Sequence, residues 1–205
     1  RTRGCHPLLP CVFPASARCH LRRPPRLSRT DSPYRPRLLD SAPEGRNTLA
    51  KHTQTLLRLA SAADAPAFGR LLHAFNVEFD ELTPDADAIA ERAAPLIESG
   101  EITVLFAGDG PDGFAELRFR PSLYTGALDA HLEELYVVPE RRGHGLGRAL
   151  LEAAMEHARE RGAAHIDLGT GEADVAARAL YESAGFTNRE GGPEGPRMLY
   201  YERDL

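Results

Sequence analysis

Cysteine and long apolar runs are scarce in this 205-residue chain. The three cysteines, Cys5, Cys11 and Cys19, lie near the start and lack the His/Cys spacing of a zinc module. Residues 51–205 contain no cysteine, so a cysteine acyl carrier is excluded there. No apolar run is long enough to cross a membrane, and we therefore expect a soluble cytoplasmic protein without a membrane partner.

Residues 1–50 lack the apolar pattern of a folded core. They carry ten arginines against three acidic residues, a net charge of +7, while the rest of the chain carries −12. Eight of the sixteen prolines also lie there, and proline interrupts both helices and sheets. We expect a disordered basic extension, followed by a folded domain at 51–205.

The extension has two functional interpretations, a targeting peptide or a basic arm that contacts nucleic acid. Its prolines disfavour the amphipathic helix of a transit peptide. Because the chain does not begin with methionine, a fragment or an over-extended upstream translation is the simpler explanation, and we expect no nucleic-acid partner.

Residues 51–205 alternate between strand and helix patterns. Apolar alternation and turn residues predict strands at 55–60, 102–106, 113–120, 132–138 and 165–169, with short final strands at 186–189 and 198–202. Helical spacing predicts helices around Phe68 to Phe75, at 84–99, after Gly147 and at 173–184, and Pro95 should bend or break the second. The order predicts an α/β domain with a mixed sheet, antiparallel first and parallel later.

A glycine-rich loop joins the strand at 132–138 to the helix that follows. Glycines let a backbone approach a ligand closely, and a helix start attracts anions, so a phosphate or pyrophosphate is the expected guest. A P-loop would need Lys and then Ser or Thr after its last glycine, but Arg148 and Ala149 follow Gly147. A dinucleotide fingerprint would need a small residue where Leu150 stands.

The pattern Arg142-x-x-Gly145-x-Gly147 resembles the loop of the GCN5-related N-acetyltransferase (GNAT) family, Gln/Arg-x-x-Gly-x-Gly/Ala. The resemblance spans residues 55–205 in element order and is most specific from 132 to 186. It implies the GNAT fold and acetyl-CoA as co-substrate, with the pyrophosphate on the loop and the pantetheine arm paired with the preceding strand. The implied positions are Leu135, Tyr136, Val137, Val138, Arg142, Gly143, His144, Gly145, Leu146, Gly147 and Arg148.

Asp174 stands where many members of the family have an asparagine that contacts the pantetheine. An aspartate can cap the helix in its place, but it cannot donate a hydrogen bond when ionised. We keep Asp174 as a cofactor-binding candidate. We expect no metal, since His131, His157 and His165 show no metal spacing.

Two residues are the catalytic candidates. Tyr181 lies in Leu-Tyr-x-x-x-Gly-Phe, which resembles the family signature whose tyrosine lies near the CoA sulfur, so it is the candidate acid; a packing tyrosine is the alternative. Glu133 and Glu134 are adjacent on a strand and should point to opposite faces. The run Leu-Glu-Glu-Leu-Tyr-Val is similar to that of diamine N-acetyltransferases, whose first acidic residue polarises a water. This makes Glu133 the candidate base, with a solvated strand residue as the alternative.

The expected activity is direct acetyl transfer from acetyl-CoA to a primary amine in a ternary complex. In the family, the segment between the first two helices borders the acceptor site, and its acidic residues favour a small cationic acceptor: Glu78, Asp80, Glu81 and Asp85. A solvated helix end is the alternative for that segment. Two alternative functions remain. One is acetylation of protein N-termini or lysines, and the other is non-catalytic binding of acyl-CoA. The oligomeric state stays open, with a homodimer as a candidate assembly.

Overall fold

A computed structural model of the protein describes residues 56–108, 110–201 and 203. These residues belong to one compact unit, Ala50–Leu205. The predicted basic extension at 1–50 lies outside the described residues. Within the described ranges, none of the helices combines the length and the apolar character that a membrane span requires.

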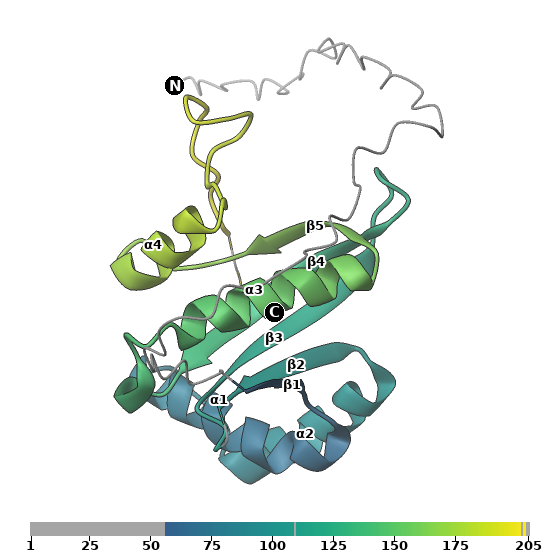
Figure 1. The fold of residues 1–205 in the computed structure, drawn as a ribbon, viewed down its shortest axis with the longest axis vertical. Helices are drawn as coiled ribbons and strands as arrows, with labels where there is room; N and C mark the ends of the chain where they lie inside the picture. The colour runs from purple at the N-terminus through teal and green to yellow at the C-terminus, as the bar shows by residue number, and fades with distance from the viewer. Residues whose placement is uncertain (1–55, 109, 202, 204–205) are drawn as a thin grey trace, which may run out of the picture. The chain divides into compact units, whose positions relative to one another are not determined.

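A five-stranded sheet forms the centre of this unit (Figure 1). Its strands follow the chain in order, and they are β1 (Leu57–Leu59), β2 (Ile102–Ala107), β3 (Gly113–Pro121), β4 (Leu128–Val137) and β5 (Ala163–Leu168). Neighbours from β1 to β4 are antiparallel, whereas β5 runs parallel to β4. The predicted mixed α/β sheet is confirmed, and the parallel pair arises because a helix carries the chain back between β4 and β5.

The helices cover the two faces of the sheet separately. They are α1 (Ala65–Glu78), α2 (Ala86–Ser99), α3 (Leu146–Glu160) and α4 (Val175–Ser183), with short 3-10 turns η1 (Ala62–Asp64) and η2 (Pro139–Arg141). The helices α1 and α2 pack on one face against Phe106 and Phe114, while α3 packs on the other against Leu117 and Leu132. Alternating side chains along β3 therefore feed two different apolar cores, as the sequence pattern predicts.

The strands β4 and β5 separate halfway along β4. The β3–β4 ladder continues to Gly113 and Val137, but the β4–β5 ladder ends at Leu132 and Leu168. Among the described residues, β4 is therefore paired on its β3 side only from Glu134 to Val137, and Glu133 has no partner in either ladder. This leaves an unpaired strand edge that leads directly into η2 and the glycine-rich loop.

The helix α2 differs from the sequence prediction at two positions, the residue that begins it and the proline inside it. The helix predicted at 84–99 begins at Ala86, because Asp85 caps it by accepting a hydrogen bond from the Ala88 amide at 2.8 Å. Pro95 lies inside α2 and does not end it. A proline lacks one amide donor, but the buried contacts of Ala90 and Ala93 keep the helix packed on the sheet.

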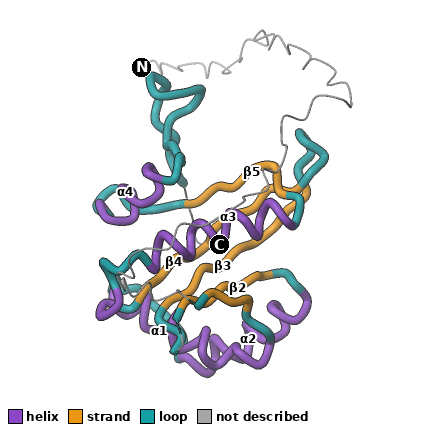
Figure 2. The backbone as a smooth tube through the Cα atoms, in the orientation of Figure 1, coloured by secondary structure: helices purple, strands orange, loops and turns teal. Residues whose placement is uncertain are grey.

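The two final strands are not formed in the described residues. After α4 the chain runs as loop (Figure 2), with one isolated bridge between Arg189 and Arg197. The Phe186 amide instead closes α4 by donating to the Tyr181 carbonyl at 3.0 Å, after Gly185 with φ of 93°. The segment at 190–196 is rich in glycine and proline, which limits the number of ladder hydrogen bonds it can make.

Candidate active site

The loop between η2 and α3 is shaped by two glycines in the left-handed region. Gly143 has φ of 74° and Gly145 has φ of 84°, and nothing lies within 4 Å of a side chain built at either position. The first helical hydrogen bond of α3 runs from the Ala149 amide to the Gly145 carbonyl at 3.0 Å, and no side chain caps the helix start. The amides of Leu146, Gly147 and Arg148 precede that bond, so they are available to an anion.

The arginines of the loop are held by neighbouring protein groups. Arg142 donates two hydrogen bonds to Glu78 at the end of α1, at 2.6 and 2.8 Å, and a third to the Val137 carbonyl at 2.8 Å. Its guanidinium also lies 5.5 Å from the centroid of the Tyr136 ring. The side chain of Arg142 therefore fixes the loop against α1 and β4, which leaves the backbone amides as the anion-binding groups.

Two further basic residues fix this region from either side. Arg141 pairs with Asp112 at 3.1 Å, in the turn between β2 and β3. Arg148 donates to the Ser183 hydroxyl at 2.8 Å and so links α3 to α4. His144 lies on the exposed outer side of the loop, with its Nδ1 at 3.3 Å from the Arg141 carbonyl.

The helix α4 packs beside the unpaired edge of β4, and Asp174 caps the start of this helix. The Asp174 carboxylate accepts a hydrogen bond from the Ala177 amide at 2.9 Å, which confirms the predicted capping. Tyr181 lies on the inner side of α4, nearly buried, with its ring 6.0 Å from that of Phe186. Burial raises the pKa of Tyr181 to about 12, and the charges of Asp174 and Glu134 add to the rise.

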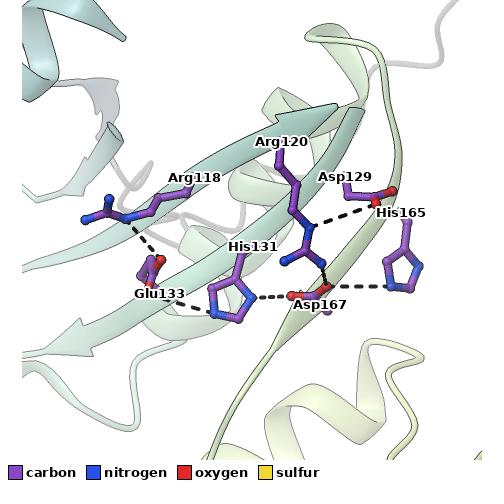
Figure 3. Close-up of polar contacts among 7 residues, drawn as sticks. All are labelled: Arg118, Arg120, Asp129, His131, Glu133, His165 and Asp167. Carbon is purple, nitrogen blue, oxygen red and sulfur yellow. Dashed lines mark hydrogen bonds and ion pairs between the residues drawn. The ribbon is translucent and has the colours of Figure 1, made fainter. Parts of the chain in front are cut away.

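A β-bulge changes the orientation of the two adjacent glutamates of β4. Leu132 pairs with Leu117 and Glu134 pairs with Glu116, so Glu133 is an extra residue in the β3–β4 ladder. The Glu133 carboxylate lies 3.0 Å from Arg118 Nε and 4.0 Å from His131 Nε2 (Figure 3). Arg118 also lies 3.6 Å from Glu116, which pairs with Glu134, so the three carboxylates share one face. The prediction that Glu133 and Glu134 point to opposite faces is therefore wrong, because the inserted residue interrupts the alternation.

Three carboxylates thus gather on one face of the sheet, beside the point where β4 and β5 separate. Burial raises the pKa of Glu116 to about 7, and the charge of Glu133 adds to the rise while Arg118 opposes it. Burial likewise raises the pKa of Glu134 to about 7, with smaller contributions from the charges of Glu116, Glu133 and Glu81. The region is therefore suited to a cation, whose binding would favour ionised carboxylates.

The acidic segment between α1 and α2 divides into two parts. Glu78 accepts hydrogen bonds from Arg142 and from the Tyr136 hydroxyl, so it supports the loop instead of an acceptor. The Arg142 guanidinium holds the pKa of Glu78 below its usual value. Glu81 is the member of the segment whose charge reaches Glu134, and Asp85 is used as the α2 cap.

The comparisons with known proteins identify the family of this chain. The sheet, in which β4 and β5 separate after Leu132, and the glycine-rich loop fit an extended ligand that carries phosphate. The chain belongs to the acetyltransferase (GNAT) family, whose model matches residues 68–186. The protein is an acetyltransferase, and its family implies acetyl-CoA as co-substrate.

Individual relatives extend over most of the domain. An aminoglycoside N(6')-acetyltransferase type 1 of Stenotrophomonas maltophilia is 32% identical over 155 residues, which cover 73% of this chain and 93% of the relative. A thialysine N-epsilon-acetyltransferase of Caenorhabditis elegans is 27% identical over 113 residues, which cover 54% of this chain and 70% of the relative. A crystal structure from Arthrobacter sp. FB24, of a protein assigned as an acetyltransferase, has a TM-score of 0.68 at 42% identity, covering 81% of this chain and 99% of the other.

The residues present fit acetyl-CoA. The left-handed glycines leave open space over the free amides at the start of α3, and β4 offers an unpaired edge from Glu133 to Val137. Tyr181 and Glu134 lie close enough for the charge of one to raise the pKa of the other across that edge. Among the described residues, no group of three or more His, Cys, Asp or Glu side chains is arranged to hold a metal ion.

The sequence did not predict that Glu116 and Glu134 share one face of the sheet with Glu133. The signal was present, because Glu116 is a charged residue at an otherwise apolar stretch of β3 that ends up 6% exposed. The pairing of Glu116 with Glu134 depends on the ladder register, and the bulge that sets the register has no glycine or proline to mark it.

Proposed function

We propose that this acetyltransferase transfers the acetyl group of acetyl-CoA directly to a primary amine of a small cationic molecule, in a ternary complex. The observation that carries the proposal is the group of Glu116, Glu133 and Glu134 on one face of the sheet, at the open edge of β4. The relatives named for aminoglycoside and thialysine acetylation support an amine as acceptor.

The proposed binding roles divide between backbone and side chains. The amides from Gly143 to Arg148 hold the pyrophosphate, and the edge of β4 from Leu135 to Val138 pairs with the pantetheine arm. Arg142 and Asp174 position the loop and α4 around that arm, and His144 lies beside the loop. The co-substrate supplies the electrophilic thioester carbonyl.

The proposed proton transfers use one residue on each side of β4. An ammonium has no lone pair, so the acceptor must lose a proton before it attacks. Glu133 takes that proton through a water, and its ion pair with Arg118 at 3.0 Å holds the carboxylate in place at the open edge of β4. Tyr181 is protonated at neutral pH before the reaction, because burial raises its pKa to about 12, and it donates its hydroxyl proton to the departing sulfur. The resulting tyrosinate then regains a proton from solvent.

Glu116 and Glu134 have a different proposed role, namely to attract the cationic acceptor. Their raised pKa values leave them partly protonated near pH 7 without ligand. A bound ammonium favours their ionised forms and so gains electrostatic stabilisation in a poorly solvated region. Glu81 adds negative charge from the loop between α1 and α2.

The test is an acceptor screen with release of the CoA thiol as readout. The full chain is incubated with acetyl-CoA and with polyamines, aminoglycosides, free lysine and lysine-containing peptides. Turnover on small polycationic amines is expected. Turnover confined to peptides would replace the proposed acceptor class with a protein substrate, and tight acetyl-CoA binding without turnover of any amine would indicate a binding module.

A further inference from the structure

A row of charged side chains crosses the sheet next to the proposed base. The ladders place His131 of β4 opposite Arg118 of β3 on one side and opposite Asp167 of β5 on the other. Figure 3 shows Glu133, His131 and Asp167 in sequence along this row, with His131 in the middle. The carboxylate of Glu133 lies 4.0 Å from His131 Nε2, while His131 Nδ1 contacts Asp167 Oδ1 directly.

The environment of Asp167 determines which nitrogen of His131 carries the proton. Arg120 Nη2 donates to Asp167 Oδ2 at 2.7 Å, so this carboxylate is the acceptor in an ion pair with Arg120. An ionised carboxylate can only accept hydrogen bonds, so the contact requires a proton on His131 Nδ1. In the neutral ring the lone pair then lies on Nε2, the nitrogen that faces Glu133.

The other charged groups around His131 do not offer Glu133 a second basic nitrogen. The charged and titratable groups that are linked to His131, directly or through successive ion pairs, come from three strands, and they are Glu116, Arg118 and Arg120 of β3, Asp129 and Glu133 of β4, and His165 and Asp167 of β5. The His165 Nε2 atom lies 4.0 Å from Asp167 and is on the far side of that carboxylate from Glu133 (Figure 3).

We propose that His131 removes the proton that Glu133 takes from the acceptor amine, and this rests on the proposed function above. The O–H bond of protonated Glu133 breaks, an N–H bond forms at His131 Nε2, and Asp167 stabilises the resulting imidazolium. The imidazolium then loses this proton to solvent through its partly exposed edge, so Glu133 is ionised again for the next turnover. His131 acts through Glu133 and is therefore a positioning residue.

The separation of 4.0 Å exceeds a hydrogen bond, so a small rotation of Glu133 or one bridging water completes the path. A purely structural role for the row predicts something different. In that case His131 only ties β4 to β5, and its removal would lower stability without a specific effect on the proton step.

Chemical rescue separates the two roles. His131→Ala is expected to lower kcat roughly tenfold near neutral pH, below the range of about 10²-fold or more for a direct base, and to leave the KM for acetyl-CoA unchanged. Added imidazole should restore much of the lost rate, because it supplies the missing base in the vacated space. A rate that is unaffected, or a loss that imidazole does not restore, overturns the proposal.

Two variants make the result interpretable. His165→Ala removes the other histidine beside Asp167 and is expected to retain the rate of the unsubstituted protein, with no response to imidazole. His131→Gln keeps a donor for Asp167 but fills the space and cannot relay a proton, so the kcat loss should persist without rescue. Equal activity of His131→Gln and the unsubstituted protein would also overturn the proposal.

A second measurement does not depend on activity. In ¹⁵N NMR at pH 8, the ring of His131, assigned by its loss in His131→Gln, is expected as the tautomer protonated at Nδ1. A ring protonated at Nε2 would overturn the relay. If the unsubstituted protein acetylates no amine, the proposed function fails and the relay fails with it; if it is active and only the His131 results disagree, the relay alone fails.

Discussion

Glu116 and Glu134 face each other across β3 and β4, and burial raises the pKa of both to about 7. An unfolded glutamate titrates near 4.5, so the folded protein binds more protons between these two values. The free energy of unfolding should therefore fall as the pH rises from about 4.5 to 7. The pair weakens the fold at neutral pH, which is consistent with a site kept for a ligand.

Glu116→Gln should reduce this pH dependence. The substitution removes a group that stays protonated to a higher pH in the folded state than in the unfolded state. The fall in the free energy of unfolding between pH 5 and 8 should therefore shrink by roughly 2 kcal/mol, at about 1.4 kcal/mol per pKa unit with partial screening. Urea denaturation at both pH values measures it. Glu152→Gln, on the exposed side of α3, is the charge-matched control. An unchanged dependence in Glu116→Gln would mean that Glu116 is ionised throughout.

Tyr181→Phe should lower kcat roughly 10²-fold or more, since only the hydroxyl that protonates the departing sulfur is lost. The ring remains packed against Phe186, so thermal stability and the Kd for acetyl-CoA should change little. Steady-state kinetics and calorimetry give these quantities. Unaltered turnover would reduce Tyr181 to a packing residue of α4.

Glu133→Gln should slow the reaction most at low pH. Fewer acceptor amines are deprotonated there, so the need for a base is greatest, and we expect a loss of roughly 10²-fold in kcat at pH 6.5 that becomes smaller toward pH 9. Glu134→Gln serves as the neighbouring comparison and should mainly raise the KM for a cationic amine. If Glu134→Gln shows the larger loss at low pH, Glu134 is the base.

Gly145→Ala should weaken acetyl-CoA binding. Its φ of 84° strains any residue with a side chain by about 1 kcal/mol or more, and the new methyl group would enter the open space above the free amides of α3. Gly100→Ala is a close control, since it has φ of 76° and open space but ends α2 away from the loop. Both variants should lose similar stability in thermal melts, whereas only Gly145→Ala should raise the Kd in calorimetric titration.

The local elements could be predicted from the sequence because their signals are local. Val137, Gly145 and Leu150 lie in a strand, a loop and a helix for reasons contained within a few residues of each. The same holds for Tyr181. The glycine at 185 and the apolar residue after it predict the end of its helix, and the Phe186 amide closes that helix on the Tyr181 carbonyl.

The arrangement of the carboxylates could not be predicted in this way. A bulge at Glu133 depends on how β3 and β4 align over their whole length, and the energy that selects the register is shared among many packed side chains. Glu78 shows the same limit, because its partner Arg142 is 64 residues away. The two final strands were predicted from the alternation of apolar and polar residues alone. That pattern does not show whether a partner strand is available to pair with them.

The open edge of β4 also has a consequence for the protein without its co-substrate. Between Glu133 and Val137 no strand of the described residues pairs with this edge, and Arg142 already occupies the carbonyl of Val137. Unpaired strand edges are templates on which a strand of another chain can add, and proteins commonly shield them with charge, bulges or covering segments. Glu133 provides two such shields here, a bulge and a charge, so the residue proposed as the base also opposes the addition of a foreign strand at this edge.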